Sequence, residues 1–300
     1  MCVSPNVSCG VPLCCEVPLS QASNLKIIYT NIDCFNSPKK NELLVQISRI
    51  KPQFVCLTEV LHKSPNSQWT FSNINIDGYA KHHPDNDKSK RGVMIFVLNE
   101  LDAKPIPELN AHTFQEAYFL NISYNKQNLI CGVVYRSPNS TLENDKSLNE
   151  LIDLASNLSI SSKLMLVGDF NYKDIDWKSY SSKHSLNHPV SNFLDTLLKN
   201  NLFQHVDSYT RYRGNDRPSC LDLVLSNTND LITSLDYNPP IGNSDHAVLN
   251  FVVDFSVDCH TPSQVKEIFD FKKADFTAIC NQLSGADWTG LFNEKSADDC

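Results

Sequence analysis

Runs of β-branched and aliphatic residues alternate along this chain with segments of helical periodicity, and this alternation limits the possible folds more than any other feature. The runs have the length and composition of buried strands. They cover 25–30, 54–58, 93–98, 117–124, 129–135, 163–168, 221–226 and 247–253. Apolar residues recur at helical spacing in 41–50, 148–158 and 190–201. The alternation predicts an α/β protein.

One segment argues against a purely parallel sheet. Within 117–135, two strand candidates are separated by the short polar stretch NKQN, which is typical of an antiparallel hairpin. We therefore expect mixed sheets.

The strand candidates deliver polar groups at their ends. The stretch LMLVGDFN, for example, passes from aliphatic residues to a carboxylate and an amide one residue apart. If the strands of two packed sheets present these ends at one edge, that edge holds a cluster suited to an active site. The residues concerned are Asn31, Glu59, Tyr135, Arg136, Asp169, Asn171, Asp245 and His246. Taken singly, each motif is also typical of an ordinary turn.

These residue types fit metal-assisted hydrolysis of a phosphodiester. A hard cation such as Mg²⁺ needs one or two protein carboxylates, so Glu59 with Asn31 or Asp245 would suffice. Asp169 beside Asn171 could position and deprotonate a water, and His246 with an acidic neighbour could stabilise the charge of the transition state. The cofactor expected is Mg²⁺, with Mn²⁺ as the alternative.

Composition narrows the partners and the compartment. The net charge of −8 disfavours a tight, sequence-independent clamp on DNA. However, residues 254–300 carry nine acids against four bases, so the main body is near neutral and compatible with a transient grip on a polyanion. Eleven scattered cysteines indicate a reducing compartment. The sequence contains no apolar run of membrane-spanning length and no secretory signal pattern, which predicts an intracellular protein without a membrane partner.

Three parts of the chain differ in character. Residues 1–22 form a leader that we expect to be disordered, 23–256 form the domain, and 257–300 form an acidic extension. The leader cysteines lack the paired spacing of a zinc site.

Six motifs in order resemble the endonuclease/exonuclease/phosphatase superfamily, and within it the apurinic/apyrimidinic-like endonuclease domain of the reverse-transcriptase proteins of non-LTR retrotransposons. The resemblance covers roughly residues 24 to 254 and rests on the whole series more than on any one motif. The motifs are YTNID (29–33), CLTEV (56–60), VVYRSPN (133–139), LVGDFN (166–171), SCLDLVLSN (219–227) and NSDHAVL (243–249).

The resemblance implies a fold and a role for each matched residue. The fold is a four-layered α/β sandwich like that of deoxyribonuclease I, in which two packed mixed β-sheets are flanked by helices. Asn31 and Glu59 would hold the metal, Tyr135 would contact the scissile phosphate, and Asp169 would activate the water. Asn171 would bind the phosphate, Asp222 would support the catalytic groups, and Asp245 with His246 would form an Asp–His pair. The residues expected to contact DNA are Thr210, Ser219, Arg136 and Arg91.

Three functions remain open at this stage. The first is a Mg²⁺-dependent endonuclease that nicks DNA and leaves a 3′-hydroxyl, favoured by the retrotransposon-like motifs. The second is a phosphoesterase acting on lipid or nucleotide substrates, and the third is a catalytically idle copy that binds nucleic acid or protein. Because 269–288 resembles the segment that leads to a polymerase, a reverse transcriptase domain in a longer parent protein is an expected partner, and a nuclear location fits that reading.

Overall fold

The computed structural model describes residues 24–63, 70–84, 91–214, 216–256 and 275–286. The predicted leader and most of the acidic extension lie outside these ranges, so the three-part division remains a prediction.

The first sheet has six strands in the order β13-β14-β1-β2-β4-β3. Strand β1 pairs in parallel with β2, and the crossover between them is the helix α1 (Ser37–Ile50); the other pairs are antiparallel. The strands are β1 (Asn24–Asn31), β2 (Phe54–Thr58), β3 (Tyr79–His82), β4 (Val93–Leu98), β13 (Ile232–Asn238) and β14 (Val248–Asp254).

The second sheet repeats this design in the order β11-β12-β8-β7-β6-β5. Strands β7 and β8 are parallel and are joined by α3 (Leu142–Leu158). The strands are β5 (Asp102–Pro105), β6 (Ala117–Tyr124), β7 (Gln127–Tyr135), β8 (Lys163–Asp169), β11 (Phe203–Gln204) and β12 (Asp222–Ser226). The remaining elements of the domain are α2 (Pro107–Asn110), α4 (Pro189–Lys199), the pair β9 (Ile175–Asp176) and β10 (Ser181–Ser182), and the 3₁₀ turns Phe71–Asn73 and Asn229–Leu231.

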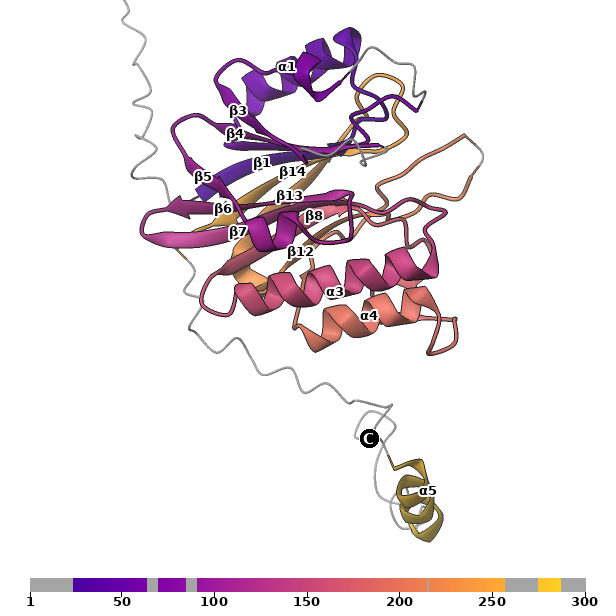
Figure 1. The fold of residues 1–300 in the computed structure, drawn as a ribbon. Helices are drawn as coiled ribbons and strands as arrows, with labels where there is room; N and C mark the ends of the chain where they lie inside the picture. Colours follow the sequence, from indigo (N-terminus) through magenta and orange to yellow (C-terminus); the bar gives the residue numbers. More distant parts are fainter. Residues whose placement is uncertain (1–23, 64–69, 85–90, 215, 257–274, 287–300) are drawn as a thin grey trace, which may run out of the picture. The chain divides into compact units, whose positions relative to one another are not determined.

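Three apolar layers hold the domain together. One lies between the two sheets and includes Tyr29, Cys56 and Val167. A second packs α3 and α4 against the outer face of the second sheet, and a third packs α1 against the outer face of the first. Figure 1 shows the resulting order of helix, sheet, sheet and helices, which confirms the predicted four-layered sandwich.

The antiparallel hairpin predicted within 117–135 is present as β6 and β7. Its turn residues, Asn125 and Lys126, both have positive φ, 49° and 63°. Such a two-residue turn matches the right-handed twist of the flanking strands.

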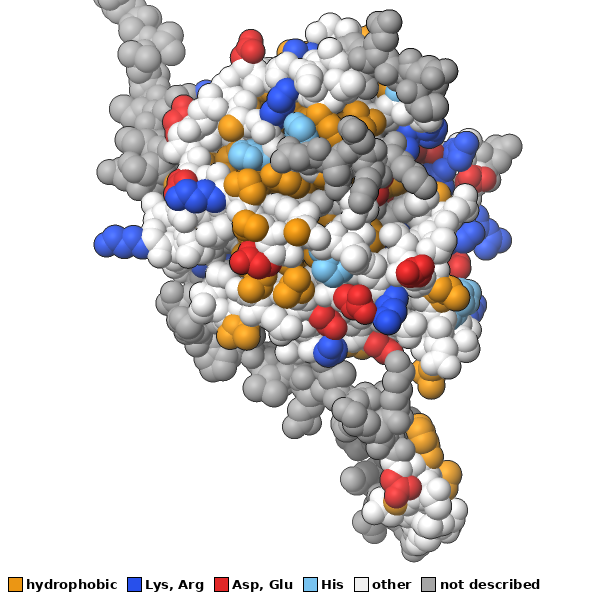
Figure 2. All heavy atoms as spheres, in the orientation of Figure 1, with side chains coloured by type: hydrophobic (Ala, Val, Ile, Leu, Met, Phe, Trp, Pro, Cys, Tyr) orange, Lys and Arg blue, Asp and Glu red, His pale blue; other side chains and the backbone are white. Residues whose placement is uncertain are grey.

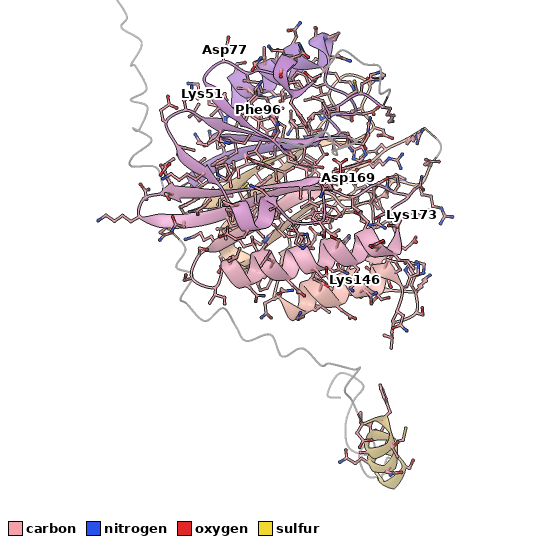
Figure 3. All side chains as sticks on the ribbon, viewed as in Figure 1. Lys51, Asp77, Phe96, Lys146, Asp169 and Lys173 are labelled. Carbon is pink, nitrogen blue, oxygen red and sulfur yellow. The ribbon has the colours of Figure 1, made fainter. Side chains whose placement is uncertain are left out.

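Residues at the strand ends meet at one edge of the sandwich. In the first sheet Asn31, at the end of β1, lies opposite Thr58, at the end of β2. In the second sheet Asp169 lies between Tyr135 of β7 and Asp222 of β12. Figure 3 shows Asp169 at this edge. Parallel pairing within each sheet therefore brings side chains from distant parts of the sequence together.

The helix α5 (Phe276–Gly285) belongs to a second compact unit, Gln264–Cys300. Asp275 caps its first turn, and Phe276, Ile279 and Leu283 are exposed on it. Among the described residues, no helix is both long and apolar enough to cross a membrane.

Candidate active site

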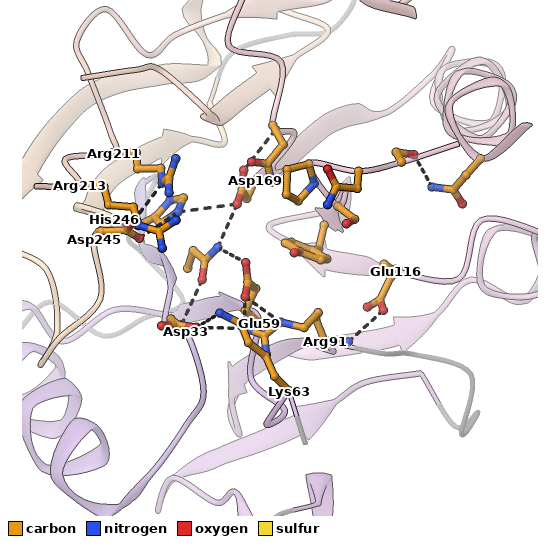
Figure 4. A pocket seen from close by; sticks show the side chains of 18 of the residues that line it. Asp33, Glu59, Lys63, Arg91, Glu116, Asp169, Arg211, Arg213, Asp245 and His246 are labelled. Atoms are coloured by element: carbon orange, nitrogen blue, oxygen red, sulfur yellow. Dashed lines mark hydrogen bonds and ion pairs between the residues drawn. The ribbon is translucent and has the colours of Figure 1, made fainter. Parts of the chain in front are cut away.

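The strand-end residues line a cleft of about 1050 Å³. Figure 4 shows acidic, basic and amide side chains converging on it from both sheets. Of the residues predicted from the sequence, the cleft contains Asn31, Glu59, Arg91, Tyr135, Asp169, Asn171, Asp245 and His246.

Asn31 bridges two carboxylates from different sheets. Its Nδ2 donates to Glu59 Oε1 over 3.0 Å and to Asp169 Oδ2 over 2.9 Å. Its Oδ1 accepts a hydrogen bond from the backbone of Asp33 over 3.0 Å, which fixes the orientation of the amide. Asn31 therefore holds two acids close together, an arrangement that their mutual repulsion would otherwise oppose.

Glu59 occupies an unusual backbone conformation. Its φ is 53°, in the left-handed region that non-glycine residues seldom adopt. Arg91 grips the second carboxylate oxygen, because both Nε and Nη2 donate to Oε2, the former over 2.7 Å. A left-handed residue at the end of a buried strand turns its side chain into the cleft at some cost in strain, as is common at functional sites.

The imidazole of His246 is hydrogen-bonded to Asp222 at Nδ1, and its predicted partner Asp245 lies farther off, at Nε2. His246 Nδ1 lies 2.7 Å from Asp222 Oδ2, whereas Asp245 Oδ1 lies 3.5 Å from Nε2 on the other side of the ring. The other oxygen of Asp222 accepts a hydrogen bond of 2.7 Å from the buried Tyr29 hydroxyl. Because Nδ1 is occupied, His246 presents Nε2 to the cleft.

Burial and charge shift the proton affinities of this cluster. Burial raises the pKa of Asp169, and the neighbouring Asp222 and Glu59 carboxylates add to the rise, although His246 and Asn31 oppose it. Burial disfavours the protonated form of His246, but Asp222 and Asp169 outweigh burial and raise the pKa of the imidazole above its ordinary value. The two side chains, with Asp169 Oδ2 and His246 Nε2 3.9 Å apart, are therefore suited to hold and exchange a proton.

A buried group of three side chains could hold a metal ion. Ligand atoms of Asp169, Asp222 and His246 all lie within 4.8 Å of one another. These residues were predicted as catalytic, while the predicted metal residues Asn31 and Glu59 lie beside Asp169. The cleft thus offers carboxylates in both places, the oxygen ligands that hard divalent cations prefer.

Tyr135 and Asn171 complete the centre of the cleft. Burial, together with Glu59 and Asp169, raises the pKa of Tyr135, so its hydroxyl remains a proton donor. Asn171 has a φ of 53°, its backbone donates to Asp169 Oδ1 over 3.2 Å, and its Nδ2 donates to the carbonyl of Arg136 over 2.8 Å. The left-handed turn directs both Asp169 and Asn171 toward the same space.

Arg136 does not line the cleft, contrary to its predicted contact with DNA. The side chain is buried and forms two hydrogen bonds to Asp145 of α3, of 2.6 and 3.0 Å. It also lies over the ring of Tyr172 and donates to the carbonyl of Asn171 over 3.2 Å. Its position supports the loop that carries Asn171 and leaves little of the guanidinium for a phosphate.

Thr210 is also placed differently from its predicted contact with DNA. Thr210 is fully buried, and its hydroxyl accepts hydrogen bonds from the backbones of Leu221 and Asp222 over 3.1 and 3.0 Å. Ser219 pairs with Arg211 through the backbone. Thr210 therefore positions Asp222, the partner of His246.

Sequence reasoning missed several charged residues of the cleft. Arg211 Nε donates to Asp245 Oδ2 over 3.1 Å, and Arg213 lies 3.9 Å from the same oxygen. Asp33 is held by Arg91 and Lys63 at 3.0 and 3.2 Å. Lys and Arg side chains project from the right-hand side of Figure 2, the side on which Asp169 lies in Figure 3. The sequence signals that could have indicated these residues were the stretch TRYRG, for the two arginines, and the position of Asp33 two residues after Asn31.

Residues 129–250, which include most of these side chains, match the family model described as "Endonuclease-reverse transcriptase". The chain carries an endonuclease/exonuclease/phosphatase domain. The candidate site of this domain lies at the strand-end edge, where the cleft gathers most of the residues named from the motifs. No curated protein matches the sequence.

Solved structures share the fold of this endonuclease/exonuclease/phosphatase domain at low sequence identity. The endonuclease domain of TRAS1, a telomere-specific non-LTR retrotransposon, has a TM-score of 0.60 at 16% identity, with 78% of this chain and 100% of that chain covered. The AP endonuclease LMAP from Leishmania major has a TM-score of 0.60 at 14% identity, covering 77% and 88%. The 3′ phosphatase NExo from Neisseria, bound to a product DNA hairpin, has a TM-score of 0.54 at 17% identity, covering 77% and 99%.

Proposed function

We propose that this domain is a Mg²⁺-dependent DNA endonuclease of the retrotransposon type, which nicks one strand and leaves a 3′-hydroxyl. The observation that carries the proposal is the position of Asp169. Its carboxylate is bonded to Asn31 beside Glu59 and faces His246 Nε2 across 3.9 Å. A water-activating base thus lies between an oxygen-rich metal site and a cationic imidazole.

The donor set at Glu59 fits Mg²⁺. The carboxylates of Glu59 and Asp169 contact the same amide nitrogen of Asn31, so hard oxygen donors are gathered at one point of the cleft. Asp222 is the poorer ligand, because it is fully buried and lies outside the cleft lining, whereas Glu59 lines the cleft. We therefore assign the cation to Glu59, with Asn31 at its side.

The bound cation would polarise a phosphate oxygen and neutralise charge on the phosphodiester. Asp169 accepts the proton of the attacking water, because its raised pKa makes it a stronger base than an exposed aspartate. His246, kept protonated by Asp222, donates from Nε2 to the charge that develops on the phosphate.

Four neutral or basic groups position the substrate. The Tyr135 hydroxyl and the Asn171 amide line the centre of the cleft, where they would contact the scissile phosphate. Arg211 and Arg213 lie at its margin, where positive charge attracts the flanking phosphates of a nucleic acid.

The family match and the described fold support DNA as the substrate. The family description pairs an endonuclease with a reverse transcriptase, so a polymerase domain in a longer parent protein would use the 3′-hydroxyl as a primer. A solved structure of the same fold is bound to a DNA hairpin. Neither fact depends on the overall charge of the chain.

The test is nicking of supercoiled plasmid by the purified protein with Mg²⁺ or with chelator. We expect Mg²⁺-dependent conversion to open circles, which Asp169→Ala and His246→Ala abolish. Asp230→Ala, at an exposed aspartate outside the cleft, should nick at the wild-type rate. Intact plasmid after incubation with folded wild-type protein and Mg²⁺ would contradict the proposal, and turnover of a phosphoinositide or nucleotide by that same protein would then indicate the phosphoesterase alternative.

A further inference from the structure

Both oxygens of the Glu59 carboxylate are already occupied by protein donors. Oε1 accepts from the Asn31 amide, and Oε2 accepts from two N–H groups of Arg91. The Arg91 guanidinium also donates to Asp33 Oδ1 over 3.0 Å and to the carbonyl of Leu61 over 3.1 Å. The donors of the Arg91 side chain are thus directed at acceptors of the protein itself.

Arg91 cannot easily withdraw from Glu59, because its backbone is tied down. Glu116 accepts hydrogen bonds from the backbone amides of Arg91 and Gly92 over 3.0 and 3.1 Å. The carbonyl of Arg91 accepts from the amide of Leu61 over 2.8 Å. The backbone that carries Arg91 is therefore paired with the backbone that directly follows Glu59, which keeps the guanidinium next to the carboxylate.

We propose that Arg91 is a built-in counter-cation of the metal-binding carboxylate: it holds Glu59 in place before metal binds and lowers the affinity of the site for a divalent cation. This inference rests on the proposed metal site at Glu59. A fixed positive charge next to that carboxylate repels an incoming dication, while the hydrogen bonds remove the cost of an unpaired, nearly buried carboxylate.

The geometry favours this role over the contact with DNA predicted for Arg91. The side chain is only 12% exposed and its donors are directed at Glu59, Asp33 and Leu61. A phosphate would have to compete with these acceptors. By comparison, the Arg213 side chain at the cleft margin is 68% exposed.

The test is a titration of metal-free protein with Mn²⁺. Binding is measured as the loss of the free-ion signal in electron paramagnetic resonance. Arg91→Gln removes the charge but keeps an amide donor, so its dissociation constant should fall about tenfold. Arg91→Lys keeps the charge and should stay within about twofold of wild type. Glu59→Gln should abolish the binding, which identifies the site.

Arg217→Gln is the matched control. Arg217 is exposed and lies outside the cleft lining, so the same loss of charge there should leave the dissociation constant unchanged. A structural role for Arg91 predicts the opposite of our proposal, because a misplaced Glu59 would bind Mn²⁺ more weakly.

Two results would overturn the proposal. One is unchanged or weaker Mn²⁺ binding by Arg91→Gln with wild-type circular dichroism. The other is tighter Mn²⁺ binding by Arg91→Lys, which would show that the positive charge is not what lowers the affinity. This second result can be obtained even if Arg91→Gln does not fold. Plasmid nicking by wild-type protein from the same preparation tests the proposed function separately. If the wild type nicks DNA but the Arg91 variants bind Mn²⁺ as just described, the role of Arg91 is wrong and the proposed function stands.

Discussion

The side chains of His246 and Asp222 connect the two sheets through a hydrogen bond of 2.7 Å. Asp222 begins β12 of the second sheet, and His246 lies just before β14 of the first. Because the bond fixes Nδ1 as a donor, the ring must present Nε2 to the cleft. The imidazole is therefore oriented by the packing of one sheet on the other.

Removing the charge of Asp222 should impair catalysis more than folding. In Asp222→Asn the amide can donate to Nδ1, which favours the wrong tautomer and a neutral ring. We expect single-turnover nicking to slow by about 10²-fold or more. Tyr29→Phe removes the hydrogen bonds of the hydroxyl to the other oxygen of Asp222 and to Thr58 but leaves the Asp222 charge in place, and it should slow nicking by about tenfold at most. Equal rates for Asp222→Asn and wild type would contradict this role.

Arg136 should contribute to stability and not to affinity for DNA. Its guanidinium and the Asp145 carboxylate are both buried, so Arg136→Met leaves an unpaired charge and should lower the free energy of unfolding by about 3 kcal/mol. Adding Asp145→Asn should recover part of that loss, as measured by urea unfolding. If Arg136→Met unfolds like wild type but binds DNA more weakly, the original prediction from the sequence is the right one.

Gly168, which precedes Asp169, is required by a close approach of two strands. A Cβ at this position would lie 1.9 Å from the carbonyl oxygen of Val134 in β7. Gly168→Ala must displace the backbone and should cost about 3 kcal/mol or more, or prevent folding. The control is Gly214→Ala, where a Cβ meets nothing within 4 Å and only the φ of 49° opposes the change. It should cost about 1 kcal/mol, so equal losses in the two variants would exclude a clash at Gly168.

Buried strands and strand-end polar groups could be predicted because their pattern is local. All five residues of β2 and of β12 are buried, and most of each strand is an apolar run, FVCL in β2 and LVL in β12. Strands β3, β5 and β13 were missed because none of their residues is buried and they carry no such run. Edge strands of this kind are held by pairing with a neighbour, which sequence periodicity does not report.

The site residues could be named from the sequence, but their partners could not. His246 was paired with its neighbour Asp245, which lies 3.5 Å from Nε2, but its hydrogen-bond partner at 2.7 Å, Asp222, lies 24 residues away on the other sheet. Thr210 was assigned to DNA from the family resemblance and Arg136 from its place at a strand end, but both are buried and hold the backbone beside Asn171 and Asp222. Such long-range contacts depend on sheet packing and leave no local signal.

Acid should destabilise the domain partly through His205, which lies outside the cleft. Burial lowers the pKa of His205 to about 4. As the pH falls below about 6.5, His205 becomes protonated in the unfolded chain, whereas in the folded domain it stays neutral until the pH reaches about 4. Stability is therefore present above the unfolded pKa and is lost across this window, by about 2 kcal/mol.

Urea unfolding of wild type and His205→Gln at pH 7 and pH 4.5 measures this contribution. The wild type should lose about 2 kcal/mol more than the variant between the two values. If both proteins lose the same amount, His205 does not account for the acid sensitivity.

Basic residues at the cleft margin should control how DNA binding depends on salt. DNA binding would be measured in an Asp169→Asn background, so that no DNA is cleaved. Each phosphate contact adds about 0.9 to the magnitude of the slope of log K against log salt. Arg213→Gln should therefore lower the slope by about one and weaken binding to all sequences alike. Arg49→Gln is the control, since Arg49 is exposed at the end of α1, which runs from the cleft edge at β1 to the start of β2 at the opposite edge. The slope for Arg49→Gln should match that of the background. A slope for Arg213→Gln equal to that of the background would remove this arginine from the DNA-binding surface and direct attention to Arg211 and Lys63.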